Sequence, residues 1–156
     1  MKKHTLPIIF LVASILWAFF IFSNSLQTGE SSGEMSGSVT EFINSILGSI
    51  SPSLEVTHKF VRKAAHFCEF AMLSLLVCFA IYFFLKDHAR REYLCLLAIP
   101  ASALVAACDE TIQLFVDGRG ASVIDVLIDS SGASAAALIF LAITLLIKLH
   151  TKKTKI

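Results

Sequence analysis

Charged residues are scarce in this chain of 156 amino acids. Lys, Arg, Asp and Glu make up 16% of it, against 56% for hydrophobic residues, and the mean hydropathy is +0.76. That composition leaves too little polar surface to cover a soluble core of this size. The net charge is only +1 and no basic, aromatic-rich segment stands out, so nucleic acid is excluded as an expected partner. Composition therefore predicts a membrane protein.

Cysteine and proline are also sparse, and neither residue defines a site. The four cysteines, Cys68, Cys78, Cys95 and Cys108, lie in apolar segments and have neither metal-binding nor redox spacing. Cys68 and Cys108 share one depth and could in principle pair, but buried free thiols that behave as small hydrophobic groups are the favoured interpretation. Pro100 falls inside an apolar segment, where it removes one backbone hydrogen bond and predicts a kink.

Long apolar segments are what the chain has in abundance. They run roughly over 6–26, 64–85, 93–116 and 122–147, each long enough at about 1.5 Å per residue to cross a hydrocarbon core of about 30 Å. The first has lysines before it and a small-x-small stretch after it, as a signal peptide does, but its apolar part exceeds the usual length of about 7 to 15 residues. We therefore predict an all-α membrane protein, a single domain over 1–156 with a bundle of four uncleaved transmembrane helices.

Lysine and arginine are distributed unevenly between the two ends of these segments. If the N-terminus is cytoplasmic, nine of them lie inside and four outside. The inner nine are Lys2, Lys3, Lys86, Arg90, Arg91, Lys148, Lys152, Lys153 and Lys155, and the outer four are Lys59, Arg62, Lys63 and Arg119. Because cytoplasmic loops carry the excess of positive charge, we predict both termini inside. The long first loop and the Asp117-Gly118-Arg119-Gly120 turn then face outward.

The long first loop contains a helical pattern of its own. Hydrophobic residues recur at helical spacing at Val39, Phe42, Ile43, Ile46, Leu47 and Ile50, which predicts a short amphipathic helix on the outer membrane surface. Its polar face offers Glu41 and serines, so attraction to anionic headgroups is not its purpose. A lid over a site and a plain connector are both open. Ser51 followed by Pro52 is typical of a helix start, so the next helix is expected to begin there, outside the membrane.

The densest group of acids lies where the third and fourth apolar segments meet. Residues 109–129 contain five carboxylates and a single base, Arg119. Burying an ionised carboxylate in hydrocarbon costs several kcal/mol, so such residues are retained only with partners, water or a function. Counted from the outer helix ends, Glu69, Glu110, Asp125 and Asp129 lie about 6 to 12 Å deep. The ionisable groups therefore share one layer in the outer half of the membrane.

Helical spacing puts these groups on single faces. The third segment carries Asp109, Glu110 and Gln113 within about 100° of arc. The second carries Lys59, Arg62, His66 and Glu69 on one stripe, and the fourth carries Ser122, Asp125, Asp129, Gly132 and Ala136. Lipid is not a partner for such stripes. We expect them to face one another, with Arg62, His66 and either Lys63 or Arg119 partly neutralising the acids.

These residues also carry a resemblance to a known family. The stretches Ser23-Asn24-Ser25-Leu26-Gln27, Arg62-Lys63-x-x-His66-x-x-Glu69, Asp109-Glu110-x-x-Gln113, Gly118-Arg119 and Asp125 to Gly132 are, in order and spacing, similar to the VanZ-like family. The resemblance implies a small multi-pass protein of the bacterial cytoplasmic (inner) membrane. It also implies a setting of antibiotic resistance at the cell envelope, since founding members are linked to reduced susceptibility to teicoplanin and related lipoglycopeptides. The motif residues correspond here to Arg62, Lys63, His66, Glu69, Asp109, Glu110, Gln113, Arg119, Asp125 and Gly132.

Three functions fit the polar layer. In the first, it binds the headgroup of a membrane lipid or a lipid-linked envelope precursor, with ligand-binding residues Arg62, Lys63, Gln113, Arg119, Asp125 and Asp129. In the second, it is an active site for acid–base chemistry, with catalytic residues His66, Glu69, Asp109 and Glu110; a variant of this hypothesis holds a divalent metal on the same four residues. In the third, protons or ions cross the layer, which is disfavoured because only Ser74, Ser102 and cysteines continue inward.

Each residue also has a purely structural interpretation. Asp125 follows Ser122 by three positions, the spacing of a capping pair, so capping the fourth helix is an equal alternative for it. Arg119 between glycines can be a solvated turn residue, although ion pairing with the nearby acids is favoured. His66 and Glu69 can form a structural hydrogen bond, and the whole cluster can be a buried network that fixes helix packing.

Overall fold

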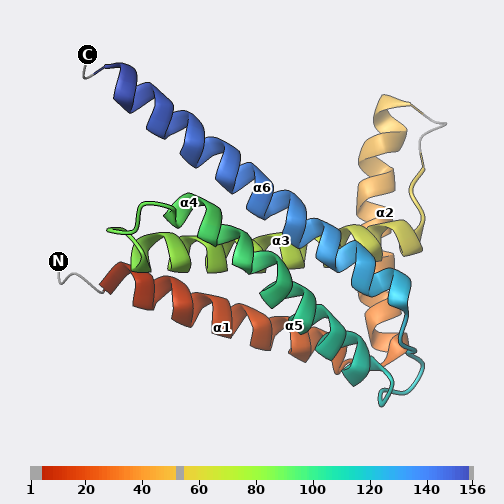
Figure 1. The fold of residues 1–156 in the computed structure, drawn as a ribbon. Coiled ribbons are helices and arrows are strands. Elements are labelled where there is room, and N and C mark those ends of the chain that lie inside the picture. Colours follow the sequence, from red (N-terminus) through yellow and green to blue (C-terminus); the bar gives the residue numbers. More distant parts are fainter. Residues whose placement is uncertain (1–4, 52–54, 155–156) are drawn as a thin grey trace.

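The chain folds into helices along nearly its whole described length. The computed structural model describes residues 5–51 and 55–154 (Figure 1). The helices are α1 (Thr5–Ser25), α2 (Gly29–Ile50), α3 (His58–Phe84), α4 (Arg91–Leu94), α5 (Ala98–Gln113) and α6 (Val123–Lys153). Four apolar stretches are long enough to cross a membrane, namely Thr5–Ser25, His58–Phe84, Arg91–Gln113 and Val123–Lys153. The predicted all-α fold with four such helices is confirmed.

The chain ends and the long connections lie at opposite ends of the bundle. In Figure 1, α1 begins and α6 ends on the side where α4 lies, and α2 and the 114–122 loop lie on the opposite side. Within the described residues the chain crosses the bundle four times, so the start of α1 and the end of α6 lie on the same side. Which end faces the cytoplasm stays a prediction. Three of the lysines that support it, Lys2, Lys3 and Lys155, lie outside the described residues.

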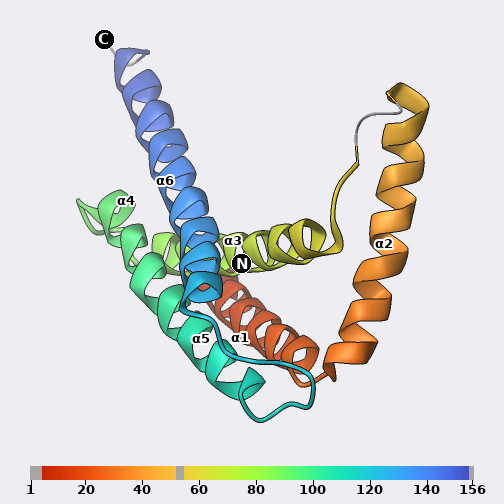
Figure 2. The same cartoon turned by 90° about the vertical axis from the view of Figure 1, so that its right-hand side faces the viewer.

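The amphipathic helix predicted in the first loop is confirmed, but it is longer than expected. It begins at Gly29, where Thr28 caps it by accepting a hydrogen bond from the Ser31 N–H at 3.3 Å. Helix α2 runs across the direction of the other long helices and lies beside their ends (Figures 1 and 2). The apolar side chains of Phe42 and Ile50 are 66% and 73% exposed. This face is therefore free to enter a membrane surface.

The expected helix start at Ser51 is wrong. The Ser51 N–H donates to the Leu47 carbonyl, so Ser51 ends α2; Pro52 lies outside the described residues. The next helix begins at His58, where the Thr57 hydroxyl accepts from the Phe60 N–H at 3.2 Å. A serine before a proline is a local signal, and here the apolar repeat on its N-terminal side continues the preceding helix instead.

The irregularity predicted at Pro100 appears just before it in the chain. A 3-10 turn at Cys95–Leu97 separates α4 from α5, which begins at Ala98. Pro100 has no N–H and cannot donate to the carbonyl four residues earlier. A tighter turn at that point therefore costs no helical hydrogen bond.

Two apolar clusters hold the helices together on either side of the bundle's middle. Near α2, the buried cluster consists of Ile21, Phe70, Leu73 and Ala106. Near α4, it consists of Cys78, Cys95, Ala98, Ala137 and Phe140. All four cysteines are free, as predicted, but Cys68 and Cys108 are exposed on the surface instead of buried. Both clusters lack charge. The buried acids Asp109, Glu110 and Asp129 lie at the end that α2 crosses, and Glu92, which pairs with Lys148, lies at the α4 end.

Gly132 sets the distance between α6 and α3. A Cβ built on Gly132 would overlap the backbone carbonyl of Phe67 on α3, so only a glycine allows the two helices to approach this closely. Phe67 follows His66, and Gly132 lies about one turn after Asp129. The close approach therefore brings Asp129 next to His66.

Candidate functional site

The predicted polar residues gather between α1, α3, α5 and α6 at the end crossed by α2. Asp109 and Asp129 are fully buried, and Glu110 and Gln113 are each 4% exposed. Asp109 and Gln113 share one face of α5, as their spacing predicted. Most of these groups have specific partners, and the partners divide the cluster into four parts.

The first part is the carboxylate of Asp109. Its Oδ2 accepts hydrogen bonds from the Ser25 hydroxyl at 2.8 Å and from the Gln113 amide at 3.0 Å. Gln113 Nε2 also lies 3.3 Å from the Ser25 oxygen, so the three side chains form a closed set. The other oxygen, Asp109 Oδ1, is buried and has no hydrogen-bond partner among the described residues. Asp109 is thus held firmly by one oxygen and left open at the other.

The second part joins Glu69 to the end of α1. Asn24 Nδ2 donates to Glu69 Oε1 at 3.0 Å, and the Trp17 indole N–H donates to the Glu69 carbonyl at 2.9 Å. Arg119 Nη2 donates to the Asn24 carbonyl at 3.1 Å. The end of α1 was part of the family resemblance, but none of its residues was predicted to belong to the site. The polar run Ser23-Asn24-Ser25 at the end of an apolar helix was the available signal.

The third part caps α6. Glu110 Oε2 accepts from the Ser122 N–H at 2.7 Å, and the Ser122 hydroxyl accepts from the Asp125 N–H at 3.4 Å. The Asp125 carboxylate instead pairs with the ammonium of Lys63 on α3. The capping pair expected of Ser122 and Asp125 therefore forms only in part, because Ser122 caps α6 but the Asp125 carboxylate does not. A carboxylate from α5, distant in sequence, takes the position that Asp125 was expected to occupy.

The fourth part is a histidine with two aspartates. His66 Nδ1 lies 3.8 Å from Asp129 Oδ2, and one ligand atom each from His66, Asp109 and Asp129 lie within 4.8 Å of one another. Both Asp129 oxygens and His66 Nδ1 are buried without a hydrogen-bond partner in residues 5–51 and 55–154. Of the four residues expected around a metal, His66 and Asp109 meet here. Glu69 and Glu110 have the other partners described above.

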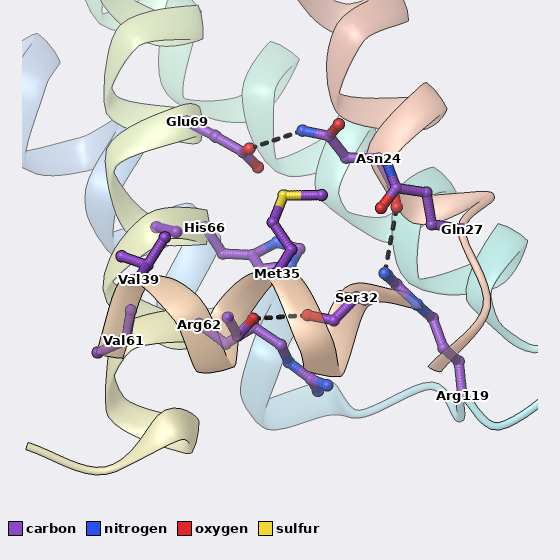
Figure 3. A pocket seen from close by; sticks show the side chains of 12 residues that line it. Asn24, Gln27, Ser32, Met35, Val39, Val61, Arg62, His66, Glu69 and Arg119 are labelled. Carbon is purple, nitrogen blue, oxygen red and sulfur yellow. Dashed lines mark hydrogen bonds between the residues drawn. The ribbon is translucent and has the colours of Figure 1, made fainter. Parts of the chain in front are cut away.

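A pocket of about 140 Å³ opens beside this cluster, under α2 (Figure 3). Figure 3 shows Arg62 reaching toward it from α3 and Arg119 from the 114–122 loop. His66 and Glu69 line its inner wall, and Met35 of α2 closes it from the other side. The amphipathic helix therefore covers the site, which favours the lid over the plain connector.

The two arginines of this pocket have no carboxylate partner. Within the part of the chain that the structure describes, no carboxylate oxygen lies within 4.0 Å of either guanidinium, so the expected ion pair of Arg119 does not form. Arg119 Nε is buried without an acceptor from any described residue. Burial, and next the charge of Arg62, lower the pKa of the Arg119 guanidinium. Two like charges thus line one pocket without a direct carboxylate partner among the described residues.

The turn that carries Arg119 is tied to the start of α2. The Gly29 N–H donates to the Asp117 carbonyl at 3.0 Å, and Gly118 has a φ of +74°, which favours glycine. A Cβ on Gly29 would overlap the Gly118 carbonyl, so the two backbones need glycine to meet. This contact holds Arg119 and α2 in register over the pocket.

The pocket is apolar on one side. Its wall includes Val61 and Ala65, and both residues also line a second hollow of about 250 Å³. The other lining residues of that hollow are Ile43, Val56, Phe60, Ala64 and Cys68. Toward the bundle's end, Arg62 and Ser36 are shared with a third hollow of about 440 Å³, lined further by Gly33, His58, Lys59 and Lys63. A charged compartment and an apolar one are therefore neighbours along α3.

Fold and site together define a multi-pass α-helical membrane protein with a mixed-charge cluster at one end of its helices. The chain belongs to the VanZ/LLP1 family, whose family model matches residues 10–146. That range contains all the residues of the polar cluster and the pocket. No curated protein and no solved structure matches the chain.

Proposed function

We propose that this protein binds the anionic headgroup of a membrane lipid, or of a lipid-linked envelope precursor, in the pocket under α2. The membrane is taken to be the bacterial cytoplasmic membrane and the pocket to face outward. One observation carries the proposal: Arg62 and Arg119 line one pocket, and neither has a carboxylate partner among the described residues. A guanidinium presents donors that match phosphate or carboxylate oxygens in pairs, so an anion is the expected ligand.

Two acids near these arginines, Glu69 and Asp125, are engaged with other partners. Glu69 accepts from Asn24, and Asp125 is paired with Lys63. A hydrogen bond to a charged group contributes about 1.5 to 3 kcal/mol. Because about 1.4 kcal/mol corresponds to a tenfold change in affinity, losing one guanidinium should weaken binding roughly 10-fold to 150-fold.

A lipid fits better than a soluble anion, because an apolar hollow lies next to the pocket. Val61 and Ala65 line both compartments, and Phe60, which lines the apolar one, is 62% exposed at the surface of the bundle. A hydrocarbon chain can lie in that hollow while its headgroup meets Arg62 and Arg119. Each methylene removed from water contributes about 0.8 kcal/mol, although a ligand already in the bilayer gains less.

The test is mass spectrometry of lipids that stay with the purified protein. Wild type should retain a phosphorylated lipid, and Arg119→Gln and Arg62→Gln should each retain at least about tenfold less. Arg90→Gln is the matched control, because Arg90 is exposed at the opposite end of the bundle. The mass of the lipid separates a glycerophospholipid from a polyprenyl-linked precursor. Equal retention by all four proteins contradicts the proposal.

We further propose that headgroup binding contributes to lower susceptibility to teicoplanin-type lipoglycopeptides, the setting implied by the family resemblance. Cells that produce wild type should then tolerate a higher concentration than cells that produce Arg119→Gln at equal membrane levels. An equal tolerance separates this biological role from lipid binding itself, which the mass spectra measure independently.

Catalysis is the second candidate, and one observation favours it. His66 lines the headgroup pocket and also lies next to Asp129, so a proton-transferring group is within reach of a bound ligand. Glu69 and Asp109 are the carboxylates on either side of it. If the protein is an enzyme, incubation with membrane lipid should yield a product of different mass, and His66→Gln should abolish it while leaving retention of the substrate lipid intact.

A further inference from the structure

We propose that His66, Asp109 and Asp129 bind one divalent transition-metal ion. The three residues come from α3, α5 and α6, and one ligand atom from each lies within 4.8 Å of the other two. Ligands that each lie about 2.0 to 2.2 Å from one ion are roughly 3 to 4 Å apart. His66 Nδ1 and Asp129 Oδ2 already lie 3.8 Å apart. Small side-chain rotations therefore complete the geometry.

The electron pairs of these residues are free for an ion. Asp129 is fully buried and neither of its oxygens has a hydrogen-bond partner among residues 5–51 and 55–154. Asp109 Oδ1 and His66 Nδ1 are likewise buried and unpartnered within those ranges. Buried carboxylates are normally hydrogen-bonded, paired or bound to a metal. By contrast, Glu69 and Glu110 each accept a hydrogen bond.

Asp109 is held as a metal ligand should be. Ser25 and Gln113 both donate to its Oδ2, which fixes the carboxylate and leaves Oδ1 without a hydrogen bond from the described residues. Hydrogen bonds of this kind orient ligands and are commonly found around metal sites. Gly132 fixes the remaining pair, because it allows α6 to approach α3 closely. The site is therefore preformed by packing.

Charge balance also favours a divalent cation. Five carboxylates, Glu69, Asp109, Glu110, Asp125 and Asp129, share the cluster with three fixed cations, Arg62, Lys63 and Arg119. One divalent cation would neutralise the excess of two negative charges. Protons on two carboxyl groups would be the other way to remove it, and the experiment below separates the two.

The ligand set indicates which ions are suitable. One imidazole and two carboxylates suit Zn²⁺ or Mn²⁺, whereas Mg²⁺ and Ca²⁺ prefer oxygen alone. A gap of about 10 Å³ beside the three ligands is lined by His66 and Asp129 but not by Asp109; its other polar lining residues are Arg62, Lys63, Glu110, Gln113 and Asp125. It has room for about one ion or one water. Because His66 also lines the headgroup pocket, an ion here would lie beside a bound headgroup.

Metal analysis of the purified full-length protein tests the site. The protein is isolated in detergent through a tag without histidine, treated with EDTA, dialysed against Zn²⁺ or Mn²⁺ and measured by plasma mass spectrometry. Wild type should hold one ion per chain. Asp129→Asn and His66→Gln should each weaken binding at least about tenfold. Asp117→Asn is the control, because Asp117 is an exposed acid on the neighbouring loop, and it should bind like wild type.

A second measurement does not depend on the variants folding. Pulsed electron paramagnetic resonance of Mn²⁺-loaded wild type should show coupling to one imidazole nitrogen, the signature of His66. Failure of wild type to bind either ion stoichiometrically overturns the proposal and leaves protonated carboxyl groups as the explanation. Bound Mn²⁺ without nitrogen coupling, or unchanged binding in folded Asp129→Asn, overturns it as well. Lipid retention is measured separately, so either proposal can fail alone.

Discussion

Replacing Gly132 with alanine would test whether the approach of α6 to α3 sets the geometry of the site. The added Cβ would overlap the carbonyl carbon and oxygen of Phe67. These are backbone atoms of a helix, so no side-chain rotation relieves the overlap. The two helices must separate locally by something on the order of 1 Å to restore ordinary van der Waals contact. Because His66 and Asp129 flank this contact, their separation should widen too.

The expected loss of stability follows from two opposing contributions. Overpacking of a tight contact costs about 1 to 3 kcal/mol, and a backbone obstacle favours the upper half of that range. Alanine in place of glycine raises the free energy of unfolding by about 1 kcal/mol through its higher helix propensity. The net effect should be a loss of about 1 to 2 kcal/mol. For a chain of this size that corresponds to a fall in Tm of roughly 2 to 8 °C.

Thermal unfolding in detergent, followed by circular dichroism, measures the effect. Gly33→Ala is the matched control, because nothing lies within 4 Å of a Cβ added there on α2, and its Tm should not fall. Metal content should fall in Gly132→Ala and stay the same in Gly33→Ala. An unchanged Tm for Gly132→Ala, or an equal fall in the control, would refute the argument that this glycine is required by close packing.

Two further substitutions test the hydrogen bonds that join helices around the site. Glu110→Ala removes the acceptor of the Ser122 N–H and should cost about 1 to 2 kcal/mol, whereas Glu110→Gln keeps a side-chain oxygen and should cost clearly less in the same unfolding assay. Similar losses for the two variants would mean that the cap contributes little. Trp17→Phe removes the indole N–H that donates to the Glu69 carbonyl, so Tm should fall by an amount equivalent to about 1 kcal/mol while metal content stays unchanged; a change in metal content would show that α1 does more than pack.

Much of the site could be predicted because its residues repeat at helical spacing. Arg62, His66 and Glu69 occupy one stripe of α3, and Asp109 and Gln113 share a face of α5. Stripes of charge in apolar helices must face protein or water, so their meeting followed from the cost of burying charge in lipid. The structure brings these stripes to one end of the bundle.

The contribution of α1 could not be predicted in this way. Asn24 and Ser25 are uncharged, and they are adjacent at a helix end, where no repeat can be recognised. Yet they supply the hydrogen bonds to Glu69 and Asp109. The ion pair expected for Arg119 does not form for a related reason, because closeness in sequence to five acids does not bring a carboxylate oxygen within 4.0 Å of its guanidinium.

Hydropathy, charge distribution and helical period are properties of short stretches of chain, and the sequence alone therefore determined four apolar helices, an amphipathic helix and a layer of ionisable groups. Which acid has which partner depends on residues far apart in the chain, and only the tertiary structure decided it. In the folded chain, Glu110 accepts a hydrogen bond from the Ser122 N–H at the start of α6, and Asp125 pairs with Lys63. Asp129 has no hydrogen-bond partner among the described residues. It lies next to His66 because Gly132, about one turn away, lets α6 and α3 meet at backbone distance.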